Sequence, residues 1–341
     1  MDSRCHDLPF VQSYYSPFLG LCQQTYNLTI IECTDNILTT KEITMKVFYN
    51  ENYTASKYAF DTTRKSNSIS TSMIEYPIQN AELADPKEFN LIAESTIKEI
   101  HSPTYVQNVK TGKGNASSQG FDWDPGIYDM AVAHSAGLVA AVDEILSGEK
   151  VAGSLSSGLH HASDTEGAGF CTFNGLAVAA RYAQESGIDN IAILDLDAHA
   201  GGGTYKIIGE HLKNTTHQTD VVVSLFDTYN LRKDDTRSQI DILGHSSGDN
   251  DYMKAVRKSL ENVTKHKPSL VIYNAGMDPI NAGISKSTLA WREELIAEWQ
   301  DALNVPLVFA LAGGYTWGSV TMPQLTNLHR LTIKAFAEMT V

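Results

Sequence analysis

Three polar side chains interrupt an apolar run at every second position. They are Asp195, Asp197 and His199, which follow the run Ile191-Ala-Ile-Leu. Alternate residues of an extended chain lie on the same face, so the pattern predicts that all three point the same way. Burying three such groups in an apolar layer costs free energy unless a partner satisfies them. A bound metal ion would satisfy them, and the pattern therefore predicts a metal site.

A further carboxylate, Asp278, follows a separate apolar run. With Asp197 and His199 it makes a set of two carboxylates and one imidazole, which leaves a position open for water. Structural zinc sites are closed by four protein ligands, whereas catalytic zinc sites have three and an open position. The set therefore favours a catalytic zinc site. Taken alone, Asp278 would also fit a carboxylate that caps a turn or a helix.

Two adjacent histidines and a tyrosine could serve the chemistry of such a site. His160 and His161 follow the apolar run 151–156, and Tyr315 follows two glycines. Paired histidines beside a metal offer a general base and a second proton carrier. A tyrosine hydroxyl held by a flexible turn could stabilise an oxyanion. Structural roles stay open for both motifs: the histidines also fit a surface loop, and the tyrosine also fits a packed core.

The elements that must position these residues follow a regular pattern. From about residue 126, helical stretches alternate with short, almost continuously apolar runs, which is typical of a parallel sheet buried on both faces by helices. Asn174 suits a helix N-cap and Gly187 a helix stop. We predict a single α/β domain with strands at 151–156, 190–197, 220–225, 269–274 and 305–311, and helices at 126–146, 174–186, 251–265, 289–303 and 323–338.

Polar or glycine-rich clusters follow most of the predicted strands. They contain His160, His199, Asp278 and Tyr315. Active sites of open parallel sheets form at the carboxyl ends of the strands. We therefore expect the four clusters to meet at one edge of the sheet.

The composition narrows the classes of partner. The net charge of −14 argues against binding to a nucleic-acid backbone and fits cationic substrates better. The four cysteines form no CxxC pair, so neither a disulfide framework nor a thiolate zinc site is indicated. No apolar segment approaches the ~20 residues that cross a bilayer, and no secretion signal is recognisable. We expect a cytoplasmic protein without membrane contact; an oligomer is possible.

Residues 1–44 have scattered aromatic side chains and neither a clear period nor a motif. They precede a strand-like start at Met45. We therefore expect an N-terminal extension over 1–44 and a catalytic domain over 45–341. The extension is either an add-on before a functional start at Met45 or a segment for capping or oligomerisation.

Six motifs occur in an order that is far more specific than any one of them. In that order the chain resembles the histone deacetylase and acetylpolyamine amidohydrolase family, which has an arginase-like α/β fold. The motifs are His101-Ser-Pro-Thr-Tyr105, Gly158-Leu-His-His-Ala162, Glu166-Gly-Ala-Gly-Phe-Cys171, Leu194-Asp-Leu-Asp-Ala-His199, Ala275-Gly-Met-Asp278 and Gly313-Gly-Tyr315.

The resemblance implies zinc-dependent hydrolysis of an acylated amine, such as an acetyl-lysine peptide or an acetylpolyamine. It implies one zinc ion per chain, held by Asp197, His199 and Asp278. His161 would be the general base and acid, and Tyr315 would polarise the amide carbonyl. The resemblance assigns further residues: His160 as an electrostatic partner backed by Asp195, Gly169 and Phe170 to the substrate tunnel, Asp122 or Asp124 to the substrate backbone, and Asp195, Ser224 and Leu225 to a structural potassium ion.

The sequence departs from the family pattern after the metal-binding histidine. The family usually has a second histidine there, then Gly and an Asp or Asn, whereas this chain has Ala200, Gly201 and Gly202. The missing carboxylate or amide normally orients the second histidine of the pair. Loss of such a partner typically lowers metal affinity or activity by ~10 to 100-fold. Water or another side chain, such as Asp164, could substitute.

Two other functions share parts of this pattern. The Asp197-Ala-His199 segment is similar to a motif of ureohydrolases, but these hold two manganese ions, and position 201 is Gly where a further Asp is wanted. A module that binds an acylated amine without hydrolysing it would fit Ala200 and Gly202. The retained zinc ligands, the two histidines and Tyr315 favour the enzyme.

Overall fold

Eight parallel strands form one sheet within residues 44–224, 237–244 and 247–339, which this computed structural model describes. The strand order is β2-β1-β3-β8-β7-β4-β5-β6. All of these residues belong to one unit, Glu42–Val341. The strands are β1 (Met45–Phe48), β2 (Ala81–Ala84), β3 (Val151–Ser154), β4 (Ile191–Asp195), β5 (Thr216–Val222), β6 (Ser238–Ile242), β7 (Leu270–Asn274) and β8 (Leu307–Ala310).

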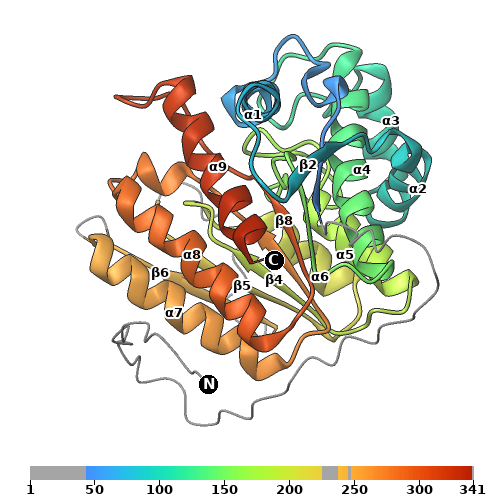
Figure 1. The fold of residues 1–341 in the computed structure, drawn as a ribbon. Helices are drawn as coiled ribbons and strands as arrows, with labels where there is room; N and C mark the ends of the chain where they lie inside the picture. Colours follow the sequence, from blue (N-terminus) through green and yellow to red (C-terminus); the bar gives the residue numbers. More distant parts are fainter. Residues whose placement is uncertain (1–43, 225–236, 245–246, 340–341) are drawn as a thin grey trace, which may run out of the picture. The chain divides into compact units, whose positions relative to one another are not determined.

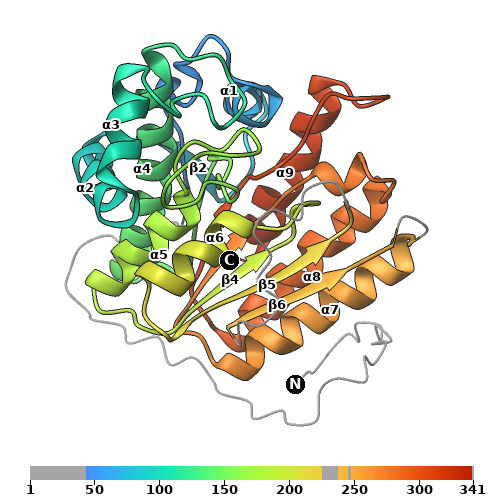
Figure 2. The ribbon, with the colours of Figure 1, turned by 180° about the vertical axis from the view of Figure 1, so that it is seen from behind.

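Helices connect the strands and cover both faces of the sheet (Figures 1 and 2). Among the described helices, none is both long enough and apolar enough to cross a membrane. The α-helices are α1 (Asp61–Glu75), α2 (Asn90–Ile100), α3 (Pro103–Thr111), α4 (Gly126–Leu146), α5 (Gly175–Glu185), α6 (Gly202–His211), α7 (Asp249–His266), α8 (Lys286–Leu303) and α9 (Met322–Glu338).

Side chains of each central strand alternate between two apolar layers. In β4, Ala192 and Leu194 pack with α1, α7, α8 and α9, whereas Ile191 and Ile193 pack with α2 to α6. Figure 1 shows the first set of helices toward the viewer, and Figure 2 shows α5 and α6 on the opposite face. Burial on both faces explains why these strands are almost continuously apolar, and it confirms the predicted α/β fold.

The predicted helices from residue 126 onward are all present, and the Asn174 carboxamide caps α5 by accepting from the Ala177 amide at 3.0 Å. The predicted strand 190–197 is too long, because β4 ends at Asp195. The carboxylate of Asp195 accepts from the amide of Asp197 at 3.1 Å, and this local bond turns the chain out of the strand. Asp197 and His199 therefore lie in a loop and not in extended chain.

Several elements did not stand out in the sequence. Helix α6 begins on three consecutive residues with little helix propensity, Gly202, Gly203 and Thr204. The Thr204 amide donates to the His160 carbonyl at 3.1 Å, so a tertiary contact supports this helix start. The predicted strand 220–225 is shifted to Thr216–Val222, where it pairs with the half-buried edge strand β6. Apart from residue 44, the predicted extension 1–44 lies outside the described residues.

Candidate metal centre and active site

The loops that follow β4 and β7 bring Asp197, His199 and Asp278 together. The Nδ1 atom of His199 lies 3.1 Å from Asp197 Oδ1 and 2.9 Å from Asp278 Oδ2. One ligand atom of each residue lies within 4.8 Å of the others. Zinc binds nitrogen and oxygen ligands at about 2.0 to 2.2 Å, so a single ion between these atoms can reach all three. The donor set and its spacing therefore fit such an ion.

Backbone groups from neighbouring loops hold the two carboxylates in place. The Ala198 amide donates to Asp278 Oδ1 at 2.9 Å, and the Gly313 amide donates to Asp197 Oδ2 at 3.1 Å. The Gly313 contact requires glycine, because a Cβ at this position would lie 2.1 Å from Asp197 Oδ2. The loop after β8 thus contributes to the centre through its backbone.

The electrostatics of the centre show how closely its charges interact. Burial lowers the pKa of His199, but the carboxylates of Asp197 and Asp278 outweigh this and raise it to about 11. Burial and the charge of Asp197 raise the pKa of Asp278 to about 6. The buried carboxylates of Asp197 and Asp278 repel each other, and a cation between them would relieve the repulsion.

The two adjacent histidines lie beside this centre in different environments. His160 Nδ1 is 2.7 Å from Asp195 Oδ2. Burial lowers the pKa of His160, but Asp195 and Asp197 raise it to about 9. Burial and the neighbouring His160 hold the pKa of His161 well below its usual range, opposed in part by a hydrogen bond to the Ala200 backbone. The pair therefore combines a charged ring with a neutral one.

The structure shows where Asp164 lies relative to the role left open by Gly202. Asp164, which could have substituted for it, pairs instead with Lys206, its Oδ1 lying 2.7 Å from the ammonium nitrogen.

A cavity of about 480 Å³ opens onto the metal centre. Gly169 is needed beside it, because a Cβ there would lie 2.3 Å from the His161 ring. Phe170 stacks on Phe60 at 4.7 Å between ring centroids, and Tyr315 stacks on Trp317 at 4.3 Å. The cavity is lined by His161, Gly169, Phe170, Ala198, His199, Val223, Ser224, Gly244, Ser247, Asp278, Asn281, Ala282, Ile284, Tyr315 and Trp317.

Of the remaining predicted site residues, one lines the cavity, two lie away from it and one lies outside the described residues. Asp124 is buried at the start of α4, where its oxygens accept from the Ser56 hydroxyl and the Gly126 amide, both at 2.7 Å. Asp122 is exposed, and neither carboxylate is among the described residues that line the cavity. Ser224 lines the cavity, and Leu225 lies outside the described residues.

Two asparagines support the site and were not predicted to do so. Asn274, at the end of β7, donates to Asp195 Oδ1 at 2.8 Å. The Asn174 carboxamide donates to the carbonyls of His160 at 3.2 Å and Ala162 at 2.9 Å. Asn274 ends a predicted strand at the active edge, which is the one signal in the sequence that could have revealed it.

Comparison with known proteins identifies the family of this chain. Residues 60–326 match the family model described as the histone deacetylase domain. The chain belongs to this family. A solved structure, that of acetylpolyamine aminohydrolase from Burkholderia pseudomallei, superposes on this deacetylase-family chain with a TM-score of 0.72 at 15% sequence identity. The match covers 87% of this chain and 99% of the other, and at this identity it shows the fold.

Two curated relatives resemble this member of the deacetylase family in sequence. Histone deacetylase 2 of Arabidopsis thaliana is 28% identical over 194 residues, which is 52% of this chain and 48% of that protein. A probable deacetylase of Archaeoglobus fulgidus is 27% identical over 237 residues, which is 64% of this chain and 66% of that protein. This deacetylase-family chain thus spans about half to two thirds of these two relatives.

Proposed function

We propose that this protein hydrolyses the amide bond of an acylated amine, such as an acetyl-lysine peptide or an acetylated polyamine, with one zinc ion at the Asp197, His199 and Asp278 centre. One observation carries the proposal. The same cavity is lined by two candidate zinc ligands, His199 and Asp278, and also by His161 and Tyr315. A scissile amide in it could therefore contact the metal ligands' ion, the proposed base and the proposed hydroxyl donor at once.

The chain's own residues divide the chemistry. A zinc ion, when bound, polarises a carbonyl and lowers the pKa of its water. His161, held neutral by burial and by His160, accepts a proton and later returns it to the leaving amine. The Tyr315 hydroxyl donates to the carbonyl oxygen as negative charge develops there. Asp195 holds His160 through its 2.7 Å contact.

The printed names of similar proteins support this class of substrate. One structural neighbour is an acetylpolyamine aminohydrolase, and the Arabidopsis relative is a histone deacetylase. The cavity walls suit an apolar acyl-amine stem, because Phe170 and Trp317 line it. Residues placed by the resemblance complete the proposal: Gly169 and Phe170 along the stem, Asp122 or Asp124 at the substrate backbone, and a potassium ion near Asp195, Ser224 and Leu225. We propose a cytoplasmic location.

The test measures turnover and zinc content together. Purified protein is assayed against a panel of acetyl-lysine peptides and acetylpolyamines, beside the variants His161→Ala and Tyr315→Phe. We expect chelator-sensitive hydrolysis, a fall in kcat of about 10²- to 10⁴-fold for His161→Ala, and one of about 10²- to 10³-fold for Tyr315→Phe. Asp278→Asn should remove one zinc ion per chain.

Other outcomes would assign a different function. Zinc at the centre without turnover of any panel member would indicate a module that binds acylated amines, with Gly202 as the first residue to restore to Asp. Two manganese ions at the centre with release of urea from a guanidino substrate would indicate a ureohydrolase.

A further inference from the structure

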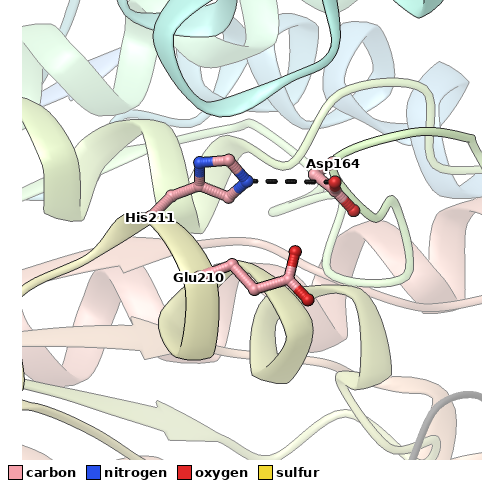
Figure 3. A group of neighbouring side chains, drawn as sticks. All are labelled: Asp164, Glu210 and His211. Carbon is pink, nitrogen blue, oxygen red and sulfur yellow. Dashed lines mark ion pairs between the residues drawn. The ribbon is translucent and has the colours of Figure 1, made fainter.

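A second group of potential metal ligands lies away from the active site. Asp164 comes from the loop that precedes Gly169, and Glu210 and His211 come from the last turn of α6. One ligand atom of each lies within 4.8 Å of the others. Figure 3 shows the imidazole and both carboxylates bordering the same space between the helix end and the loop.

The His211 side chain is 31% exposed, but its Nε2 atom is buried and makes no hydrogen bond within the described part of the chain. A carboxylate oxygen, Asp164 Oδ2, lies 3.8 Å from this atom. This distance is too long for a hydrogen bond but suits two ligands of one ion.

Lys206 already pairs with one oxygen of Asp164. Its ammonium nitrogen lies 2.7 Å from Asp164 Oδ1, which leaves Oδ2 on the side of His211. A divalent cation would therefore compete with Lys206 for Asp164.

We propose that Asp164, Glu210 and His211 bind a divalent transition-metal ion such as Zn²⁺. An imidazole with two carboxylates suits zinc and its neighbours, whereas magnesium and calcium prefer oxygen ligands alone. The site is distinct from the Asp197, His199 and Asp278 centre and does not depend on the function proposed for that centre.

Such an ion would fasten two segments that border the active site. The loop of Asp164 leads to Gly169 and Phe170, which line the cavity. Helix α6 starts three residues after His199, and its Thr204 amide holds the His160 carbonyl at 3.1 Å. The ion joins the far end of this helix to the loop, so it stabilises the walls of the cavity without touching substrate.

The test counts zinc ions in the dialysed full-length chain and its variants. We expect two ions in the wild type, one in His211→Ala, one in Asp278→Asn and none in the double variant. Glu261→Gln, on the exposed side of α7, is the matched control for Glu210→Gln and should keep both ions. Lys206→Met should bind the second ion about tenfold more tightly, because it removes the competing charge.

The two sites fail independently in this design. If the wild type holds one ion that His211→Ala loses and Asp278→Asn keeps, the second site stands and the proposed catalytic centre does not. If His211→Ala and Glu210→Gln hold as many ions as the wild type, the second site is wrong. Zinc affinity at this site only in the millimolar range would also overturn it.

Discussion

At the scale of single residues, the candidate metal centre depends on the absence of a side chain at Gly313. Its amide holds Asp197, and a Cβ there would come within 2.1 Å of Asp197 Oδ2 and 2.7 Å of the Asp278 carboxylate. Both candidate ligands would have to move to accommodate one methyl group. Position 313 therefore accepts no side chain without displacing both candidate ligands.

We predict that Gly313→Ala weakens zinc binding and lowers hydrolysis by about 10²-fold, because a displacement of about 1 Å in a catalytic site has a cost of that order. Zinc titration and steady-state kinetics would measure both effects. Gly248→Ala is the control, since a Cβ at Gly248 meets nothing within 4 Å. If Gly313→Ala keeps wild-type zinc affinity, the loop after β8 shifts to accommodate the methyl group without displacing the ligands, and the prediction is wrong.

The sequence predicted many individual residues of the site because their polarity contrasts with apolar strands. Asp197 and His199 stood out in this way, and the structure brings both to Asp278. The expected reason was only partly right, because they gather through a turned loop and not along an extended strand. For Asn174 the sequence predicted only its role as a helix N-cap. Its hydrogen bonds to the histidine loop depend on tertiary packing, which a single sequence does not reveal.

At the scale of elements, Asn174 connects the start of α5 to the loop of the two histidines. Its Oδ1 atom accepts from the Ala177 amide at 3.0 Å as a helix cap. Its Nδ2 atom donates to the carbonyls of His160 and Ala162 and, at 3.0 Å, to the Thr204 hydroxyl of α6. One carboxamide thus joins two helices and the loop of the two histidines.

Two substitutions separate these roles. Asn174→Ala removes both and should lower the free energy of unfolding by about 1 to 3 kcal/mol, with a loss of turnover. Asn174→Asp keeps the cap acceptor but cannot donate to the two carbonyls, so it should recover more of the stability than of the turnover. Urea unfolding and kcat would measure the two quantities. Full activity in Asn174→Asp would mean that these donated bonds do not position the histidines.

Elements were predictable where burial leaves a strong pattern. The central strands and the later helices follow from continuous apolar runs and from caps. Edge strand β6 is only partly buried, and α6 starts on glycines, so neither has a distinct local pattern. Helix α6 forms because its first turn contacts the histidine loop, which is a tertiary effect.

At the scale of the whole molecule, buried neutral histidines should make the fold sensitive to acid. Burial lowers the pKa of His101 to about 4 and that of His134 to about 3. An unfolded histidine titrates near 6.5, so below that pH the unfolded chain binds more protons than the folded one. The stability that these two histidines contribute is therefore fully present above about pH 6.5 and is lost as the pH falls toward 4.

Each of these histidines should contribute a slope of roughly 1 kcal/mol per pH unit between pH 6 and 5. Urea unfolding of the wild type and of His134→Gln at several pH values would measure it. The slope is the informative quantity, because the substitution also lowers stability at neutral pH through lost contacts. An unchanged slope in His134→Gln would contradict the assignment.

The order of the strands has a consequence for the synthesis of the chain. Strands β7 and β8 come last along the sequence, yet they lie in the middle of the sheet between β3 and β4. A nascent chain that has emerged only as far as β6 has two separate half-sheets, whose inner edges have no neighbour. The carboxylate of Asp278 and the loop of Tyr315 arrive with those late strands. The sheet can therefore close, and the candidate metal centre can form, only after β8 and the loop of Tyr315 have been synthesised.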